Sequence, residues 1–259
     1  MITPEQSTFW RRNGYLWIRE FLSAADTAAL LAWTDELAAR PDTPGRWMRY
    51  YERPAGGAKM LARIENFLPF HEGLDALFRS GRVAALLRDL MGDDPVVFKD
   101  KINMKLPGGQ PFTPHQDAPA YVDFGVDYHA TIMLPVDHFT RENGCLEIAV
   151  EGAQTATLPQ NPDGSMRDDQ VGRFTYTPLL AAPGDLIVFD SYVPHFSGPN
   201  RSAGPRRSYY VTFNRAADGD HRADYYARKR ELFPPECERI PGVDYAARGA
   251  QFNLSNPFE

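Results

Sequence analysis

The sequence of 259 residues has few cysteines, no long hydrophobic run and no excess of positive charge. Its two cysteines, Cys145 and Cys237, are too few for a disulfide framework or a cysteine-rich zinc site. The formal net charge of −6 argues against a nucleic-acid partner, because phosphates are neutralised by clustered cations. Nothing approaches the roughly 18 apolar residues of a membrane span, and the first residues do not resemble a signal peptide. We therefore expect a cytoplasmic protein with no nucleic-acid and no membrane partner.

Turn-forming residues, by contrast, are plentiful. The 20 glycines and 22 prolines exceed the share of roughly 12% found in an average protein, which favours a β-rich fold over a helix bundle. From Val96 onward, short apolar runs alternate with glycine- and proline-containing turns, as in a barrel or a double-sheet jelly roll. The runs that we expect to be strands are 96–106, 130–136, 145–150, 186–189 and 207–213.

The first part of the chain shows helix signals instead. Thr3 and Pro4 begin a helix that Gly14 ends, Ser23 caps a second helix, and the apolar spacing over 81–91 predicts a third. No repeat or linker divides the chain. We therefore expect one domain over 1–259, in three parts: a helical layer with edge strands (1–95), a β core (96–215) and a C-terminal extension (216–259).

The most distinctive local pattern is His115-Gln116-Asp117. On an extended strand, residues i and i+2 point to the same face, so the imidazole of His115 and the carboxylate of Asp117 would converge. Alone, the pattern also fits a polar turn, but a second histidine would complete the two-His, one-carboxylate set that holds non-haem Fe(II). His195, which follows the apolar run 186–189, is the candidate, although by itself it also fits a buried core histidine.

A longer pattern, spread over both halves of the chain, points to one family. It reads His115-x-Asp117, then His195-x-Ser197-x-x-Asn200-x-Ser202-x-x-x-Arg206. This pattern resembles the signature of the phytanoyl-CoA dioxygenase family. Three shorter motifs resemble that family too: Asn13-Gly14-Tyr15, Glu142-Asn143-Gly144-Cys145-Leu146 and Pro183-Gly184-Asp185. The resemblance runs from the first helix to about Phe213 and thins over 161–175 and 216–259.

The resemblance implies both a fold and a chemistry. The family consists of Fe(II)/2-oxoglutarate-dependent oxygenases, so we expect a mainly β protein with N-terminal helices and a double-stranded β-helix (jelly-roll, cupin-like) core. The implied Fe(II) ligands are His115, Asp117 and His195. The residues implied for the co-substrate 2-oxoglutarate are Arg206, which would pair with its C5 carboxylate, Ser197 and Asn103. O2 is the other co-substrate.

Asp117 also bears on the type of reaction. Halogenating members of this superfamily have a small residue at its position, so the carboxylate favours hydroxylation, with release of succinate and CO2. Arg207 competes with Arg206 for the co-substrate, but strand alternation turns it to the opposite face. The remaining histidines match no motif position and are interpreted as structural or exposed: His71, His129, His138 and His221.

A row of polar residues precedes the His-x-Asp pattern. On a strand, Lys99, Lys101, Asn103 and Lys105 share one face, which is either solvated or an inward row with anions opposite. The motifs around it resemble those of aminoalkylphosphonate hydroxylases of the family, which implies a small anionic substrate such as an aminoalkylphosphonate. The substrate contacts that we predict are Lys101, Lys105, Tyr50, Tyr51, Arg63, Asn66 and Tyr121. Aromatic rings among them could hold an ammonium group by cation–π contact.

Other functions stay open at this stage. The same chemistry could act on a natural product or an acyl thioester, and a different class would be a catalytically silent jelly roll that binds a metal or a ligand. A zinc hydrolase is a further alternative, although its ligand spacing usually differs. The tail 253–258 is either a lid or a frayed end. A homo-oligomer is neither predicted nor excluded.

Overall fold

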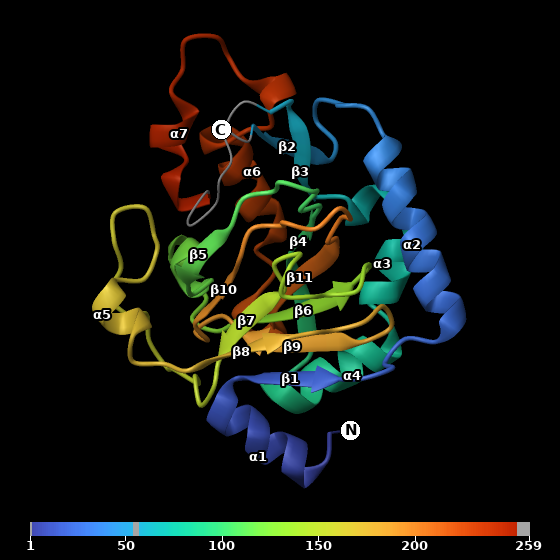
Figure 1. Ribbon diagram of the computed structural model, residues 1–259, viewed down its shortest axis with the longest axis vertical. Helices are drawn as coiled ribbons and strands as arrows, with labels where there is room; N and C mark the ends of the chain where they lie inside the picture. Colours follow the sequence, from blue (N-terminus) through green and yellow to red (C-terminus); the bar gives the residue numbers. More distant parts are fainter. Residues whose placement is uncertain (1, 54–56, 253–259) are drawn as a thin grey trace.

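Two antiparallel β-sheets form the core of the molecule (Figure 1), which a computed structural model describes over residues 2–53 and 57–252. The larger sheet has the strand order β1 (Tyr15–Ile18), β9 (Leu186–Asp190), β6 (Ala130–Pro135), β11 (Ser208–Arg215), β4 (Pro95–Asn103), β3 (Met60–Glu65) and β2 (Met48–Glu52). The smaller sheet has the order β5 (Phe112–His115), β10 (His195–Ser197), β7 (Leu146–Ala149) and β8 (Tyr176–Leu179). The double-sheet jelly-roll core that the sequence predicts is confirmed.

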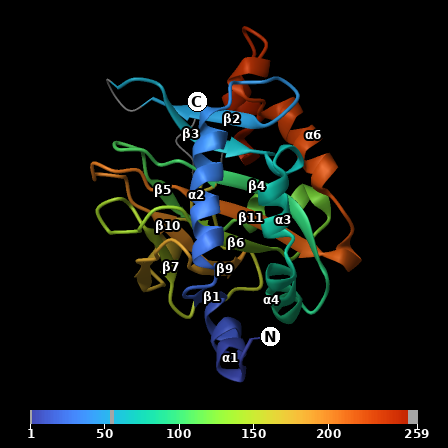
Figure 2. The same ribbon diagram turned by 90° about the vertical axis from the view of Figure 1, so that its right-hand side faces the viewer.

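The larger sheet is covered on its outer face by helices. α2 (Ala24–Ala39) crosses the strands, and α3 (Glu72–Phe78) and α4 (Gly81–Met91) lie beside it (Figure 2). Alternation along β6 explains the two faces: Ile132 joins the cluster under the helices, whereas Met133 packs against the smaller sheet. Both clusters exclude water from apolar side chains, and this burial is the main source of stability.

The predicted helix ends are confirmed. α1 (Pro4–Asn13) begins with a capping box between Thr3 and Gln6, and it ends at Gly14, whose N–H donates to the carbonyl of Trp10. Gly14 has a φ of 71°, and a Cβ there would lie 2.2 Å from a methyl carbon of Val193. Only glycine satisfies both conditions, so this residue joins α1 to β1.

The segment that the sequence left without structure forms α6 (Arg222–Leu232), α7 (Tyr245–Arg248) and the 3-10 turn η6 (Ala250–Phe252). Aromatic side chains such as Tyr225 and Phe252 pack with Tyr50 of β2 and Phe98 of β4. The C-terminal part therefore closes one end of the jelly roll (Figure 1). The predicted lid or frayed end at 253–258 lies outside the described residues.

Strands were missed where the apolar alternation is weak. The hairpin β2–β3 and the strand β8 carry charged residues, threonine or proline within their runs, so they lack the pattern of a half-buried strand. A four-residue helix, α5 (Asp168–Val171), lies in the segment 161–175, where the family resemblance thins. In the two described ranges, no helix has the length and apolar character that crossing a membrane requires.

Candidate active site

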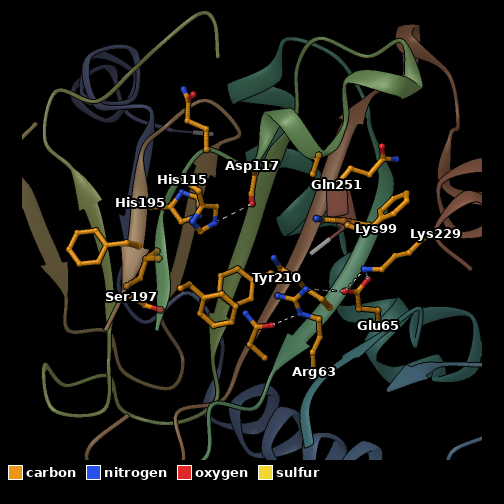
Figure 3. A pocket seen from close by; sticks show the side chains of 18 of the residues that line it. Arg63, Glu65, Lys99, His115, Asp117, His195, Ser197, Tyr210, Lys229 and Gln251 are labelled. Atoms are coloured by element: carbon orange, nitrogen blue, oxygen red, sulfur yellow. Dashed lines mark hydrogen bonds and ion pairs between the residues drawn. The ribbon is translucent and has the colours of Figure 1, made fainter. Parts of the chain in front are cut away.

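Three predicted ligands meet at the mouth of the jelly roll. His115 is the last residue of β5 and His195 the first of β10, and the two are paired in register, so their ring centroids lie 4.3 Å apart. Oδ1 of Asp117 lies 3.8 Å from Nε2 of His115. The ligand atoms of the three residues all lie within 4.8 Å of one another (Figure 3). We call His115, Asp117 and His195 the triad.

Asp117 reaches the triad by a route that differs from the prediction. The strand ends at His115, and Asp117 has helical backbone angles (φ −75°, ψ −30°) at the start of the turn Ala118–Ala120. The amide of Ala118 donates to the carbonyl of Ser191, 2.9 Å away. This hydrogen bond anchors the turn to the residue that follows β9. The predicted extended backbone at Asp117 is therefore wrong, although the side chains of His115 and Asp117 do converge.

Main-chain carbonyls set the protonation of both imidazoles. Nδ1 of His115 lies 2.6 Å from the carbonyl of Thr113, and Nδ1 of His195 lies 2.9 Å from that of Val193. A carbonyl only accepts, so each Nδ1 carries the hydrogen and each Nε2 keeps a lone pair for a metal. Burial, helped by the neighbouring His195, lowers the pKa of His115 to about 3, which keeps the ring neutral.

The carboxylate of the triad stays ionised although it is buried. Burial by itself raises the pKa of Asp117, but the positive charges of Lys101 and of Lys99 help to outweigh this and hold it well below its usual range. Two neutral imidazoles and one carboxylate are the donor set of a facial triad, which leaves positions open on the metal. The residues present therefore fit Fe(II).

Arg206 and Ser197 lie together at one end of the site. The guanidinium of Arg206 is 1% exposed, and it donates to Ser208 Oγ (3.0 Å), Tyr210 Oη (3.3 Å) and Ser197 Oγ (3.4 Å). Its Nε has no hydrogen-bond partner in the described part of the chain. Arg207 points away and pairs with Asp137 and Asp35, so Arg206 is the arginine that contacts Ser197 and Tyr210 of the cavity wall.

A cavity extends from the triad to the other side, along β4 and β3. Lys99, Lys101 and Asn103 of β4 line it, as does Arg63 of β3. Lys99 Nζ lies 4.4 Å from the ring centroid of Tyr121, and Lys101 Nζ lies 5.2 Å from that of Tyr210. Neither ammonium makes a hydrogen bond or an ion pair with a residue in the ranges that the structure covers. Burial, with the charge of Lys99, lowers the pKa of Lys101 well below its usual value.

Two residues of the cavity wall escaped the sequence analysis. Both carboxylate oxygens of Glu65 accept from Lys229 Nζ at 2.7 Å, and Glu65 also pairs with Arg63 at 3.3 Å. Burial raises the pKa of Glu65, yet Lys229 and Arg63 outweigh it and hold the pKa at about 2. Lys229 comes from α6, so no local pattern could have paired it with a residue 164 positions earlier.

The predicted substrate contacts divide into two groups. Arg63 and Lys101 line the cavity, whereas Tyr121 lies behind Lys99. The others lie elsewhere: Tyr50 donates to the carbonyl of Phe233, Tyr51 contacts Arg49 and Asp42, Asn66 contacts Arg222, and Lys105 contacts Ser197. The rings of Tyr50 and Tyr51 already face the ammonium groups of Lys229 and Lys59, at 5.1 Å and 3.9 Å.

The other histidines lie away from the triad. His71 caps α3 through its Nδ1, and His221 contacts the carbonyl of Asp218. His138 is exposed. His129 is buried against Phe98, and its Nε2 has no hydrogen-bond partner among the described residues.

This jelly roll, with two imidazoles, one carboxylate and a buried arginine beside them, defines the class of Fe(II)- and 2-oxoglutarate-dependent oxygenases. A family model confirms the class and narrows it. The model of the family described as Phytanoyl-CoA dioxygenase (PhyH) matches residues 10–208, so the chain belongs to that family.

Two similar proteins act on phosphonates according to their names. A 2-aminoethylphosphonate dioxygenase from an uncultured bacterium is 42% identical over 258 residues, which cover 99% of this chain and 98% of the relative. A methylphosphonate hydroxylase from Gimesia maris is 39% identical over 232 residues, covering 90% and 88%. The chain is thus a 2-oxoglutarate-dependent non-haem iron dioxygenase.

Solved structures show the same fold. EctD from S. alaskensis with 2-oxoglutarate and 5-hydroxyectoine superposes with a TM-score of 0.72 at 20% identity, covering 84% of this chain and 77% of that one. The same protein with bound Fe has a TM-score of 0.70 at 18% identity, covering 84% and 78%. Because the chain belongs to the dioxygenase family and its triad fits Fe(II), iron is its cofactor and 2-oxoglutarate its co-substrate.

Proposed function

We propose that this dioxygenase hydroxylates a C–H bond of a small phosphonate, such as an aminoalkylphosphonate, and releases succinate and CO2. The observation that carries the proposal is the pair Lys99 and Lys101. Their ammonium groups face the cavity beside the triad and make no ion pair with a carboxylate in the described part of the chain; the charges of Asp117 and Glu65 act on them only from a distance. Buried cations without counter-ions are unfavourable, so the cavity is built for an anion.

The charges around the cavity suggest a doubly charged ligand. Four cations line it, namely Arg63, Lys99, Lys101 and Lys229, whereas only Glu65 and Asp117 are anionic. The basic side chains of the lining outnumber the acidic ones by two, which calls for negative charge on the substrate. A phosphonate dianion supplies that charge, and the names of the two relatives support this class. Among the described residues, nothing favours an acyl thioester or a natural product.

Each group of residues then has a task. His115, Asp117 and His195 would hold the iron, which with 2-oxoglutarate supplies the oxidising chemistry when both are bound. Arg206 and Ser197 would hold the distal carboxylate of the co-substrate. Lys99 and Lys101 would hold the substrate's anionic group, which brings its carbon chain beside the triad.

We further propose that the three predicted parts of the chain act as one domain. Arg63 comes from the first part, the triad and the lysines from the β core, and Lys229 and Phe252 from the C-terminal part. All of them line the same cavity, which supports one domain with one site.

The test is succinate release by the Fe(II)-loaded enzyme with 2-oxoglutarate and O2. We expect 2-aminoethylphosphonate and methylphosphonate to stimulate it, and the carboxylate analogue 3-aminopropanoate to have little effect. Stimulation by no phosphonate would contradict the proposed substrate class. His195→Ala should abolish release with every substrate.

A lysine variant tests the cavity itself. Lys99→Met should raise the KM for the phosphonate on the order of tenfold, the cost of one charge-assisted hydrogen bond, and leave the KM for 2-oxoglutarate unchanged. Lys59→Met is the matched control. Lys59 lies outside the lining of this cavity and forms an ion pair with Glu236, with 2.6 Å between Nζ and Oε2. An unchanged phosphonate KM in Lys99→Met would argue against the role of this lysine.

A further inference from the structure

The wall of the cavity beside the triad carries a limited set of oxygen atoms that can accept a hydrogen bond from a ligand. Eight lining residues have a side-chain oxygen: Glu65, Asn103, Gln116, Asp117, Ser197, Tyr210, Tyr225 and Gln251. A donor on a buried ligand needs an acceptor, because an unsatisfied polar group is unfavourable away from water. The oxygens without a partner in the protein therefore show where such a donor can bind.

Most of these oxygens are already engaged. Asp117 belongs to the triad. The protein donors to the others are Lys229 for Glu65, Arg63 for Asn103, the amide of Leu158 for Gln116, and Arg206 for Ser197 and Tyr210. Two side chains are left, those of Tyr225 and Gln251. Neither makes a hydrogen bond with another residue in the part of the chain that the structure describes.

The C-terminal part of the chain holds these two groups on the same wall. The ring of Tyr225, on α6, packs edge-on against that of Phe252, the neighbour of Gln251 in η6, with 5.6 Å between the ring centroids. η6 also packs against the turn that follows Asp117. Figure 3 shows Gln251 beside Lys99, on the side of the triad away from Ser197. A ligand held by Lys99 therefore has this wall within reach.

The surroundings of Tyr225 favour a positive group. Burial raises the pKa of Tyr225 well above its usual value, and the charge of Glu65 adds to this more than that of Arg63 subtracts. The hydroxyl therefore stays neutral, and the field at its oxygen favours a cation over an anion. An ammonium N–H is the kind of donor that fits such an oxygen.

The aromatic rings of the lining are less suited to an ammonium group, because most of them already face a cation of the protein. The distances from Nζ to the ring centroid are 5.2 Å (Lys101 to Tyr210), 5.8 Å (Lys99 to Tyr225), 5.8 Å (Lys229 to Phe252) and 4.9 Å (Lys105 to Phe112). The ring of Phe196 packs on that of Tyr176. A second cation on an occupied ring would meet a like charge.

The lysines of β4 cannot serve as acceptors once an anion is bound. Burial lowers the pKa of Lys99, and it lowers that of Lys101 further. A phosphonate beside them acts in the opposite direction, because a nearby anion favours the charged form of an amine. Both side chains then carry N–H donors and no lone pair. They can hold a phosphonate group but not an ammonium group.

We infer that Gln251 and Tyr225 are specificity-determining residues, whose side-chain oxygens accept from the ammonium group of an aminoalkylphosphonate held by Lys99 and Lys101. The inference rests on the proposed function and narrows it. A site with acceptors for N–H groups disfavours an analogue that lacks them, because the acceptors then stay unpaired. The enzyme therefore prefers a phosphonate that carries an ammonium group to one that ends in a methyl group.

The experiment compares 2-aminoethylphosphonate with propylphosphonate, in which a methyl group replaces the ammonium group. We would measure both Kd values by calorimetry, on protein loaded with Fe(II) and 2-oxoglutarate in the absence of O2. The wild type should bind 2-aminoethylphosphonate more tightly. In Gln251→Leu we expect the affinity for 2-aminoethylphosphonate to fall on the order of tenfold and that for propylphosphonate to stay within about twofold.

Three further variants sharpen the comparison. Gln251→Glu places a carboxylate at the same position, so the preference for 2-aminoethylphosphonate over propylphosphonate should increase. Tyr225→Phe removes the second acceptor and should weaken 2-aminoethylphosphonate alone. Gln170→Leu is the matched control: Gln170 is half-buried like Gln251, and its side chain contacts Asp169 and Arg173 outside the lining. It should bind both ligands like the wild type.

The outcomes separate the inference from the proposed function. A wild type that binds neither phosphonate would contradict the proposed function itself. Equal affinity of the wild type for both ligands would overturn the inference alone, and so would an equal loss for both in Gln251→Leu, which would place Gln251 on the phosphonate group. No loss in either Gln251→Leu or Tyr225→Phe would overturn it as well. Where Gln251→Leu does not fold, an unchanged preference in Gln251→Glu contradicts the inference.

Discussion

At the scale of single residues, each imidazole of the triad is oriented by a carbonyl two positions earlier in the chain. Thr113 serves His115 and Val193 serves His195, so both rings present Nε2 in the same tautomer. In both cases the polar contact is made by the main chain, and the carbonyl by itself fixes the orientation of the ring. The geometry of a strand end is therefore enough to prepare both nitrogens for a metal.

A buried carboxyl group outside the site should make stability depend on pH. Burial raises the pKa of Asp190 to about 7, against an ordinary value of 3.8, although it accepts from the amide of Tyr192. Between about pH 4 and 7 the folded protein therefore holds a proton that the unfolded chain has lost, and the free energy of unfolding falls as pH rises.

Asp190→Asn removes this dependence, because its amide cannot ionise. The difference in unfolding free energy between variant and wild type should grow in favour of the variant by up to about 1.4 kcal/mol per pH unit across that window. Urea unfolding at pH 5 and at pH 7 measures it. A difference that stays constant between the two pH values would show that Asp190 is not protonated in the folded protein.

At the scale of secondary-structure elements, the ion pair between Glu65 and Lys229 connects β3 to α6. Both groups are almost fully buried, with side-chain exposures of 1% and 2%. Desolvation of two charges offsets much of their attraction, so the pair contributes less to net stability than its short distances suggest. Its value lies in where it holds α6, since that helix also brings Tyr225 to the cavity.

Replacing one partner of this ion pair should lower the free energy of unfolding more than replacing both partners. Lys229→Met leaves Glu65 buried with Arg63 as its remaining cation, and we expect a loss of about 3 kcal/mol of unfolding free energy. The double variant Glu65→Gln, Lys229→Met should recover most of that loss. Denaturant unfolding of the two single variants and the double variant forms a double-mutant cycle. Losses that simply add would show that the two side chains do not interact.

At the scale of the whole molecule, the site lies where both sheets and the C-terminal helices meet (Figure 1). The apolar clusters that hold these layers together contain none of the triad residues, although Phe189 of the cluster between the sheets packs on the ring of His195 at 5.0 Å. The two histidines are carried on strands that pair with each other and, for His195, with β7. Metal is thus not needed to close the fold.

Removal of iron should therefore leave the protein folded. Treatment with a chelator should abolish the visible charge-transfer band of the Fe(II)–2-oxoglutarate complex and leave the far-ultraviolet circular dichroism unchanged. Adding Fe(II) back under anaerobic conditions should restore the band. A loss of β-sheet signal in the metal-free protein would instead make the metal part of the folding energy.

What the sequence determined by itself is the local framework of the protein. Its signals lie in short segments of the chain. They are the helix caps such as Thr3 and Gly14, the apolar runs of the central strands, and the local motifs around His115, Asp117 and His195. The alternation of apolar runs and turns was enough to predict a barrel or jelly roll, whereas the iron ligands and the class of reaction were predicted by the resemblance of the longer pattern to a family.

The tertiary structure decided the rest, because it depends on partners that are far apart in the chain. Whether a lysine lines the cavity beside the triad or contacts Ser197 follows from where β4 ends, which separates Lys101 from Lys105. The pairing of Glu65 with Lys229 needs α6 to pack on the sheet. Long-range contacts of this kind assign each charge its counter-ion, and the charges left without one define the ligands that the protein can bind.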